Sequence, residues 1–101
     1  MRSTWNLRQH KDKHMSLSFP NASRSYDPTR QAVRFWGYDS AMETSFFVMA
    51  DALRQLQPGI RPDEESLLQA FDTNRERICA AATKVYKRGN KGSYELGPTD
   101  F

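Results

Sequence analysis

Residues 63–88 read DEESLLQAFDTNRERICAAATKVYKR, and this stretch decides the fold class of the chain. Its apolar residues recur at spacings of three or four, or at sums of these, which places them on one face of a helix. Charged and polar residues fall mostly on the other side, as a helix with one buried face requires. The stretch therefore predicts an amphipathic helix packed on a core. The residues of the apolar face are Leu67, Phe71, Ile78, Ala82 and Val85.

Both ends of this stretch carry helix-end signals. Asp63 can act as the N-cap, and the two glutamates that follow it suit the positive end of the helix dipole. Lys84, Lys87 and Arg88 suit the negative end, and Gly89 is a natural residue just beyond the last turn.

One position interrupts the apolar face. Asn74 lies on it, and Thr73 with Glu76 matches the capping-box pattern that can start a second helix. Either one helix of about 26 residues, roughly 39 Å long, runs through, or the helix breaks near Thr73. Because neither glycine nor proline occurs within residues 63–88, we expect the continuous helix.

The rest of the chain predicts short strands and turns. Residues 32–38 and 43–49 alternate in the way typical of strands, and their short connection implies an antiparallel hairpin. Asp27-Pro28-Thr29-Arg30 is typical of a type I turn. Shorter strands are expected at residues 17–19, 23–26 and 93–96, and a short helix at residues 50–57.

Together these elements predict an α+β fold, a small antiparallel β-meander packed against one long amphipathic helix plus a short helix. The 101 residues are enough for one domain. We expect a flexible basic leader over residues 1–14 and a single α+β domain over residues 15–101. Met15 can equally be the biological start.

Composition narrows the class of protein. The apolar fraction of 38% and the charged fraction of 27% are typical of a soluble globular domain. No apolar run approaches the roughly 20 residues that span a bilayer, so no membrane partner is expected. Cys79 is the only cysteine, which excludes an internal disulfide and favours a reducing cytoplasmic location. A buried, inert thiol is the expected state of Cys79.

The net charge of +3 lies entirely in the leader, which has four basic residues against one acidic residue. Residues 15–101 carry 11 basic and 11 acidic groups, so the domain has no overall field that attracts polyanions. His10 and His14 are one helical turn apart, but a structural metal site needs four ligands, so no metal is expected.

Four segments carry a family resemblance. The segments LSFPN (residues 17–21), AVRFWG (32–37), LLQAFDTNRERICAAATKVY (67–86) and GSYEL (92–96) occur in this order. This arrangement resembles a family of small bacterial proteins known as domain of unknown function 1488. The resemblance covers nearly everything after the leader. It implies a compact α+β fold in the bacterial cytoplasm and no assigned activity, so it provides no catalytic residues.

The first candidate site lies on the strand at residues 32–38. Arg34, Trp36 and Tyr38 share one face of it, and Phe47 of the next strand can join them. Such a face stacks single-stranded bases or accepts side chains of a partner, so these residues form a candidate partner surface. The alternative is that a helix covers this face and that the aromatic residues belong to the core.

The second candidate is an anion patch made of Lys84, Lys87, Arg88 and Lys91. It lacks the spacing of a phosphate-binding loop, and it follows a helix, where the dipole repels anions. The alternative is a solvated helix end that matches its dipole.

The third candidate is the polar cluster at residues 72–76, which needs a pocket beside Asn74. No pattern of nucleophile and base, and no cofactor motif, is present, so no cofactor is expected. We therefore expect a non-enzymatic binding or regulatory module that acts through a macromolecular partner, either an unknown protein or a second copy in a homodimer. The alternative is weak nucleic-acid binding through the leader and the helix end at residues 84–91.

Overall fold

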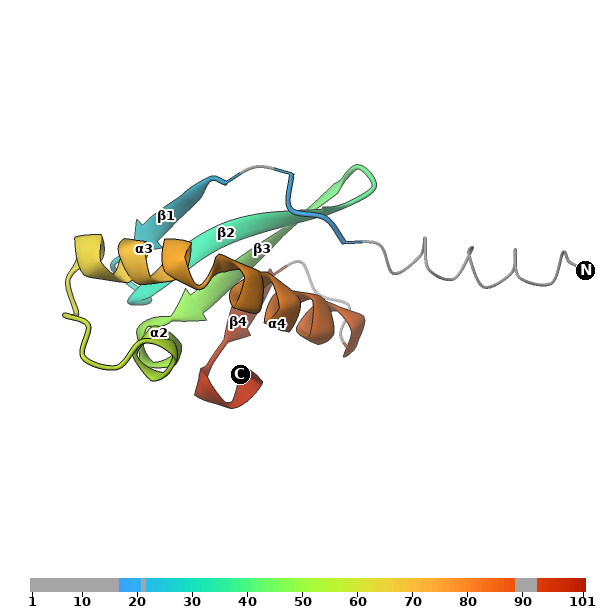
Figure 1. The fold of residues 1–101 in the computed structure, drawn as a ribbon. Helices are drawn as coiled ribbons and strands as arrows, with labels where there is room; N and C mark the ends of the chain where they lie inside the picture. The colour runs from blue at the N-terminus through green and yellow to red at the C-terminus, as the bar shows by residue number, and fades with distance from the viewer. Residues whose placement is uncertain (1–16, 21, 89–92) are drawn as a thin grey trace, which may run out of the picture.

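The computed structural model describes residues 17–20, 22–88 and 93–101. Figure 1 shows a four-stranded sheet with helices packed against it. The predicted α+β class is confirmed, whereas the predicted leader lies outside the described residues. The elements are β1 (Arg24–Asp27), β2 (Ala32–Asp39), β3 (Met42–Met49), α2 (Ala50–Leu56), α3 (Glu64–Thr73), α4 (Arg75–Arg88), β4 (Ser93–Leu96) and a 3-10 helix, η1 (Pro98–Asp100).

The sheet has the strand order β1-β2-β3-β4. β1, β2 and β3 form the expected antiparallel meander, in which Phe35 lies opposite Phe46. β4 runs parallel to β3, because the chain returns to the sheet through the helices. The strand expected at residues 17–19 forms only a bridge, in which Ser18 and Tyr38 exchange backbone hydrogen bonds of 2.9 and 2.8 Å.

The turn between β1 and β2 follows from its sequence. The Asp27 carboxylate accepts hydrogen bonds from the backbone N–H groups of Thr29 and Arg30, at 3.0 and 3.2 Å. An aspartate that bonds two or three residues onward is typical of a tight turn. These bonds lower the pKa of Asp27, the one from Arg30 most strongly.

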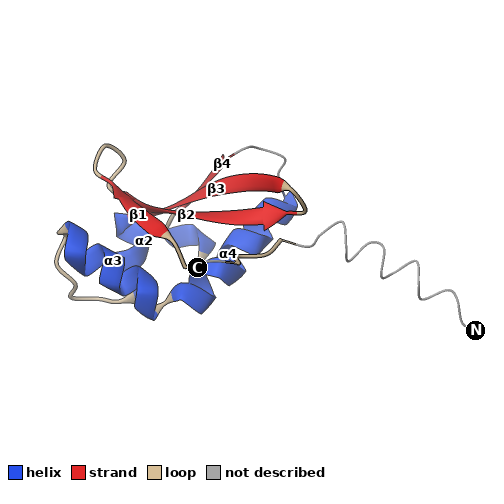
Figure 2. Cartoon of the chain, turned by 90° about the horizontal axis from the view of Figure 1, so that it is seen from above, coloured by secondary structure: helices blue, strands red, loops and turns tan. Residues whose placement is uncertain are grey.

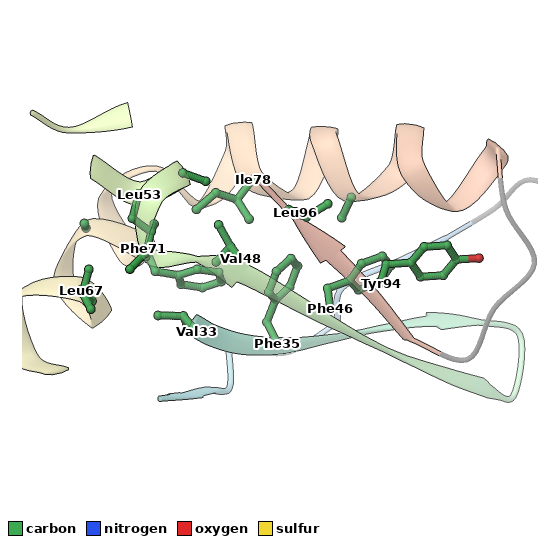
Figure 3. Close-up of a cluster of buried hydrophobic side chains, with 14 residues drawn as sticks. Val33, Phe35, Phe46, Val48, Leu53, Leu67, Phe71, Ile78, Tyr94 and Leu96 are labelled. Carbon is green, nitrogen blue, oxygen red and sulfur yellow. The ribbon is translucent and has the colours of Figure 1, made fainter. Parts of the chain in front are cut away.

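The helices lie together on one side of the sheet (Figure 2). The hydrophobic core fills the space between them and the inner face of the sheet (Figure 3). Phe35 joins the two layers, because its ring is 5.3 Å from Phe46 in the sheet and 5.1 Å from Phe71 in α3. Each such side chain contributes roughly 1.5–3 kcal/mol when fully buried. The largest fully buried side chains are Phe35, Phe46, Phe71, Leu53, Leu67, Ile78, Leu96, Val33 and Val48.

The expectation of one continuous helix over residues 63–88 is wrong. α3 ends at Thr73 and α4 begins at Arg75, with Asn74 between them at φ −108° and ψ 21°. Asp63 caps α3 as predicted, since its carboxylate accepts from the Ser66 N–H at 2.7 Å.

The break satisfies the polar group of Asn74. Its side-chain amide donates to the Ala70 carbonyl at 2.9 Å and to Gln57 Oε1 at 3.2 Å. Without these partners a half-buried amide on the apolar face would lose its hydrogen bonds to water. α3 contacts β1 and β2, whereas α4 contacts β4 at the opposite edge of the same sheet.

Candidate functional site

One face of the sheet is turned away from the helices. Because side chains alternate along a strand and Val33 and Phe35 point into the core, the intervening residues of β2 point the other way. Among the described elements no helix covers this surface (Figure 2), which we call the open face. Its side chains from β2 and β3 include Ala32, Arg34, Trp36, Tyr38, Glu43, Ser45, Phe47 and Met49.

The three residues predicted as a partner surface therefore lie side by side on the open face. Arg34, Trp36 and Tyr38 are each partly exposed. The alternative, in which a helix covers them, does not occur in the part of the chain that the structure describes. The structure thus shows their common placement, and their role in binding stays a prediction.

Arg34 lies at the centre of the open face. Its Cζ atom is 4.9 Å from the ring centre of Trp36 and 5.7 Å from that of Phe47. Its Nη2 donates to Ser45 Oγ at 3.0 Å. Its Nε–H is buried and has no hydrogen-bond partner among the described residues. Stacking and one neutral hydrogen bond therefore hold the guanidinium, and no described carboxylate forms an ion pair with it.

Arg30 is a residue of this surface that the sequence analysis missed. It belongs to the β1–β2 turn, but its Cζ lies 4.2 Å from the ring centre of Phe47. It also pairs with Asp27 at 3.2 Å and with Glu95 at 3.7 Å. Arg34 is the second arginine near this ring, at 5.7 Å, and Phe47 is only 6% exposed although no described helix covers it. The long stem of an arginine allows such reach, but the turn sequence does not reveal its direction.

Tyr38 is fixed at one end of the open face. Its hydroxyl donates to Glu43 Oε2 at 2.9 Å. This hydrogen bond, followed by burial, raises the pKa of Tyr38 above its ordinary value. The phenol therefore stays neutral at physiological pH and presents its ring rather than a charge.

The open face and its rim have a mixed charge. Arg30 and Arg34 are set against three carboxylates, so the formal charge is one negative. Each carboxylate is already engaged: Asp27 and Glu95 with Arg30, and Glu43 with Tyr38. Arg34 is the charged group there without an oppositely charged partner in the described chain.

The predicted anion patch is only partly within the described residues. Lys84 and Lys87 are exposed on α4, on the helix side of the sheet. The side chain of Arg88 and the whole of Lys91 lie outside the described residues. The structure therefore does not bring these two lysines together with the open face, which is on the opposite side of the sheet.

The third candidate, the polar cluster at residues 72–76, lines a depression of about 410 Å³ that residues 72–77 form. All of these residues are consecutive, so the depression is the gap where the helix breaks rather than a pocket between distant elements. Asp72 is engaged by Arg24 of β1, at 2.9 and 2.8 Å, and the Asn74 amide is used as described above. This arrangement weakens the hypothesis of a small-molecule site.

The thiol of Cys79 is half-buried on α4. Burial raises the pKa of the Cys79 thiol, and the nearby Arg75 offsets this only in part. Cys79 is thus mostly protonated at neutral pH, as an inert thiol is. In the described part of the chain, no three or more metal-binding side chains gather, and none of its helices is long and apolar enough to cross a bilayer.

A family model described as Protein of unknown function (DUF1488) matches residues 17–96. The chain belongs to this family. The match extends to the last residue of β4, so the DUF1488 unit includes the open face and both helices of the 63–88 stretch. No curated protein and no solved structure matches the chain.

Proposed function

We propose that this DUF1488 protein is a non-enzymatic binding module that acts through a macromolecular partner, and that the open face is its contact surface. One observation carries the proposal: Arg34, Trp36 and Tyr38 gather on a sheet face that no described helix covers. Tryptophan, tyrosine and arginine are the residue types that most often dominate binding energy at protein interfaces.

The pKa shifts near this surface support contact rather than acid–base chemistry. The hydrogen bond to Glu43 raises the pKa of Tyr38, and turn hydrogen bonds lower the pKa of Asp27. Both shifts move a group away from neutral pH, whereas a general acid or base needs a pKa close to it. We further propose a bacterial cytoplasmic location, which the single cysteine and the family resemblance favour.

The test uses the full-length protein as bait, together with Trp36→Ala. Wild type should capture a partner from a bacterial lysate, and Trp36→Ala should reduce capture at least tenfold, because an interface aromatic typically contributes more than 1.4 kcal/mol. Arg61→Ala is the control, since the Arg61 side chain is 81% exposed in the loop between α2 and α3, away from the open face. Far-UV circular dichroism checks that each variant is folded.

Two outcomes would reject the proposal. The first is capture that is the same for wild type and Trp36→Ala. The second is saturable turnover of a small metabolite by the purified protein, which would indicate an enzyme.

The alternative function is weak nucleic-acid binding through the leader and the helix end at residues 84–91. The exposure of Lys84 and Lys87 favours it. It predicts an affinity that falls steeply with salt, because released counterions drive such binding. It also predicts that Lys84→Gln weakens binding while Trp36→Ala does not. Binding that does not change with salt would exclude it.

A further inference from the structure

Arg34 distinguishes the open face from an ordinary exposed sheet surface. We infer that the open face recognises an acidic segment of a partner protein, in which a carboxylate binds Arg34 and a neighbouring apolar side chain lies on Trp36. This inference rests on the proposed function and specifies the chemistry of the partner.

The hydrogen bonding of Arg34 is incomplete among the described residues. Its Nε–H is buried without a hydrogen-bond partner in the described chain, and its only polar contact there is the Ser45 hydroxyl. A donor left unsatisfied in this way is unfavourable, and a carboxylate is the acceptor that best fits the fork of Nε and Nη donors. Arg34 is partly exposed, so a ligand can reach the guanidinium and draw it off the rings of Trp36 and Phe47.

The neighbours of Arg34 along β2 match the spacing of an extended peptide. Alternate side chains of a strand are roughly 7 Å apart, which is also the spacing of alternate side chains in an extended peptide. If an extended peptide places a carboxylate on Arg34, its side chain two positions away in one direction along the peptide lies on Trp36. Trp36 and then Tyr38 continue the row on the same face. The surface thus fits a carboxylate followed or preceded by an apolar residue.

The charges of the rim favour a protein over a nucleic acid. Asp27, Glu43 and Glu95 flank the open face, and Glu95 has a side-chain exposure of 62%. A phosphate backbone carries a negative charge at every nucleotide and would meet these carboxylates along its length. A single carboxylate placed at Arg34 avoids them.

The size of the face disfavours a second copy of this chain. Four strands about 4.8 Å apart, with about six residues each at 3.3 Å, cover roughly 400 Å². A stable protein interface buries roughly 800 Å² on each partner. This projected area accommodates one or two extended segments, and a stable dimer would need contacts beyond the open face.

The test selects random eight-residue peptides, displayed on phage, on the immobilised full-length protein. We expect the enriched sequences to carry aspartate or glutamate within two positions of an aromatic or aliphatic residue. A synthetic copy of the strongest peptide should bind at least tenfold more weakly to Arg34→Gln than to wild type. It should bind equally well to the control variant Arg61→Gln, because the Arg61 side chain is 81% exposed in the loop between α2 and α3. In a ¹⁵N spectrum of the full chain, the Arg34 Nε–H signal should shift when this peptide is added.

A change in the peptide makes the test independent of the folding of any variant. Replacing its acidic residue by the matching amide should weaken binding to wild type at least tenfold and should have little further effect on Arg34→Gln. Equal losses with both proteins would show that the carboxylate does not contact Arg34, and would overturn the inference.

Other outcomes separate this inference from the proposed function. Enriched peptides that lack acidic residues but lose binding with Trp36→Ala would overturn the inference and leave the proposed function intact. Failure to enrich any peptide would also overturn the inference. So would a 12-nucleotide oligothymidylate that binds the protein more tightly than the selected peptide and loses this binding with Trp36→Ala. A dimer in solution that Trp36→Ala dissociates would replace the peptide with a second copy of the chain.

Discussion

Gly37 lies on the inner face of β2, and its lack of a side chain gives room to the segment before β1. A Cβ atom at this position would lie 2.9 Å from Phe19 Cε1 and 3.2 Å from Leu17 Cδ1. The backbone of Gly37 does not have the positive φ that favours glycine, so space rather than conformation is the constraint. We therefore predict that Gly37→Ala destabilises the protein by displacing Phe19.

The size of the effect follows from how firmly Phe19 is held. Its ring centre is 5.9 Å from that of Phe35 and 6.0 Å from that of Phe46, and both of those side chains are fully buried. Forcing an extra methyl group into such a site costs about 1–3 kcal/mol. The alanine restricts the unfolded chain, which returns about 0.4–1 kcal/mol. The free energy of unfolding should fall by about 1–2 kcal/mol.

Urea denaturation of the full-length protein, followed by far-UV circular dichroism, measures this change. The same substitution is then made in a Phe19→Ala background, where the ring is absent and Gly37→Ala should be neutral or stabilising by about 0.5 kcal/mol. Gly97→Ala is a matched control, because no atom lies within 4 Å of the Cβ that it would add. An equal loss in the two Phe19 backgrounds, or no loss with Phe19 present, would refute the packing of residues 17–19 on Gly37.

Three further predictions concern ionisable groups. The hydrogen bond from the Ser66 N–H lowers the pKa of Asp63. The stabilisation by the Asp63 carboxylate is therefore present above the ordinary aspartate pKa and is lost as the pH falls through the lowered pKa. Asp63→Asn should flatten the curve of unfolding free energy against pH in this acidic range, and an unchanged curve would contradict the cap. Iodoacetamide at pH 7.5 should alkylate Cys79 at least tenfold more slowly in the native protein than in 8 M urea, because burial raises the pKa of the thiol; equal rates would show an open thiol. Tyr86→Phe should lower the free energy of unfolding by about 1 kcal/mol by removing the hydrogen bond of 2.7 Å to Asp39, which thermal or urea unfolding measures; a Tyr86→Phe variant as stable as wild type would contradict this bond.

Periodicity determined most of the elements. The alternation in residues 32–38 and 43–49 predicted both central strands, and it placed Arg34 and Trp36 on the opposite face from Phe35, as the structure has them. The apolar residues at helical spacing in residues 63–88 predicted helical structure with Phe71 and Ile78 buried. Both the helical structure and the burial of these two side chains are confirmed. These features follow from the order of polar and apolar residues along a few turns or a single strand.

Contacts between distant parts of the chain decided the rest. α3 ends at Thr73, and the amide of the next residue, Asn74, donates to Gln57, 17 positions earlier in the sequence. Arg30 reaches across the sheet to Phe47, which no turn pattern reveals. The sequence by itself thus determined the elements, the α+β class and which side chains share a face. Only the tertiary structure decided that the described helices α2, α3 and α4 lie on one side of the sheet and do not cover Arg34 and its neighbours, since local propensity does not specify which surfaces meet.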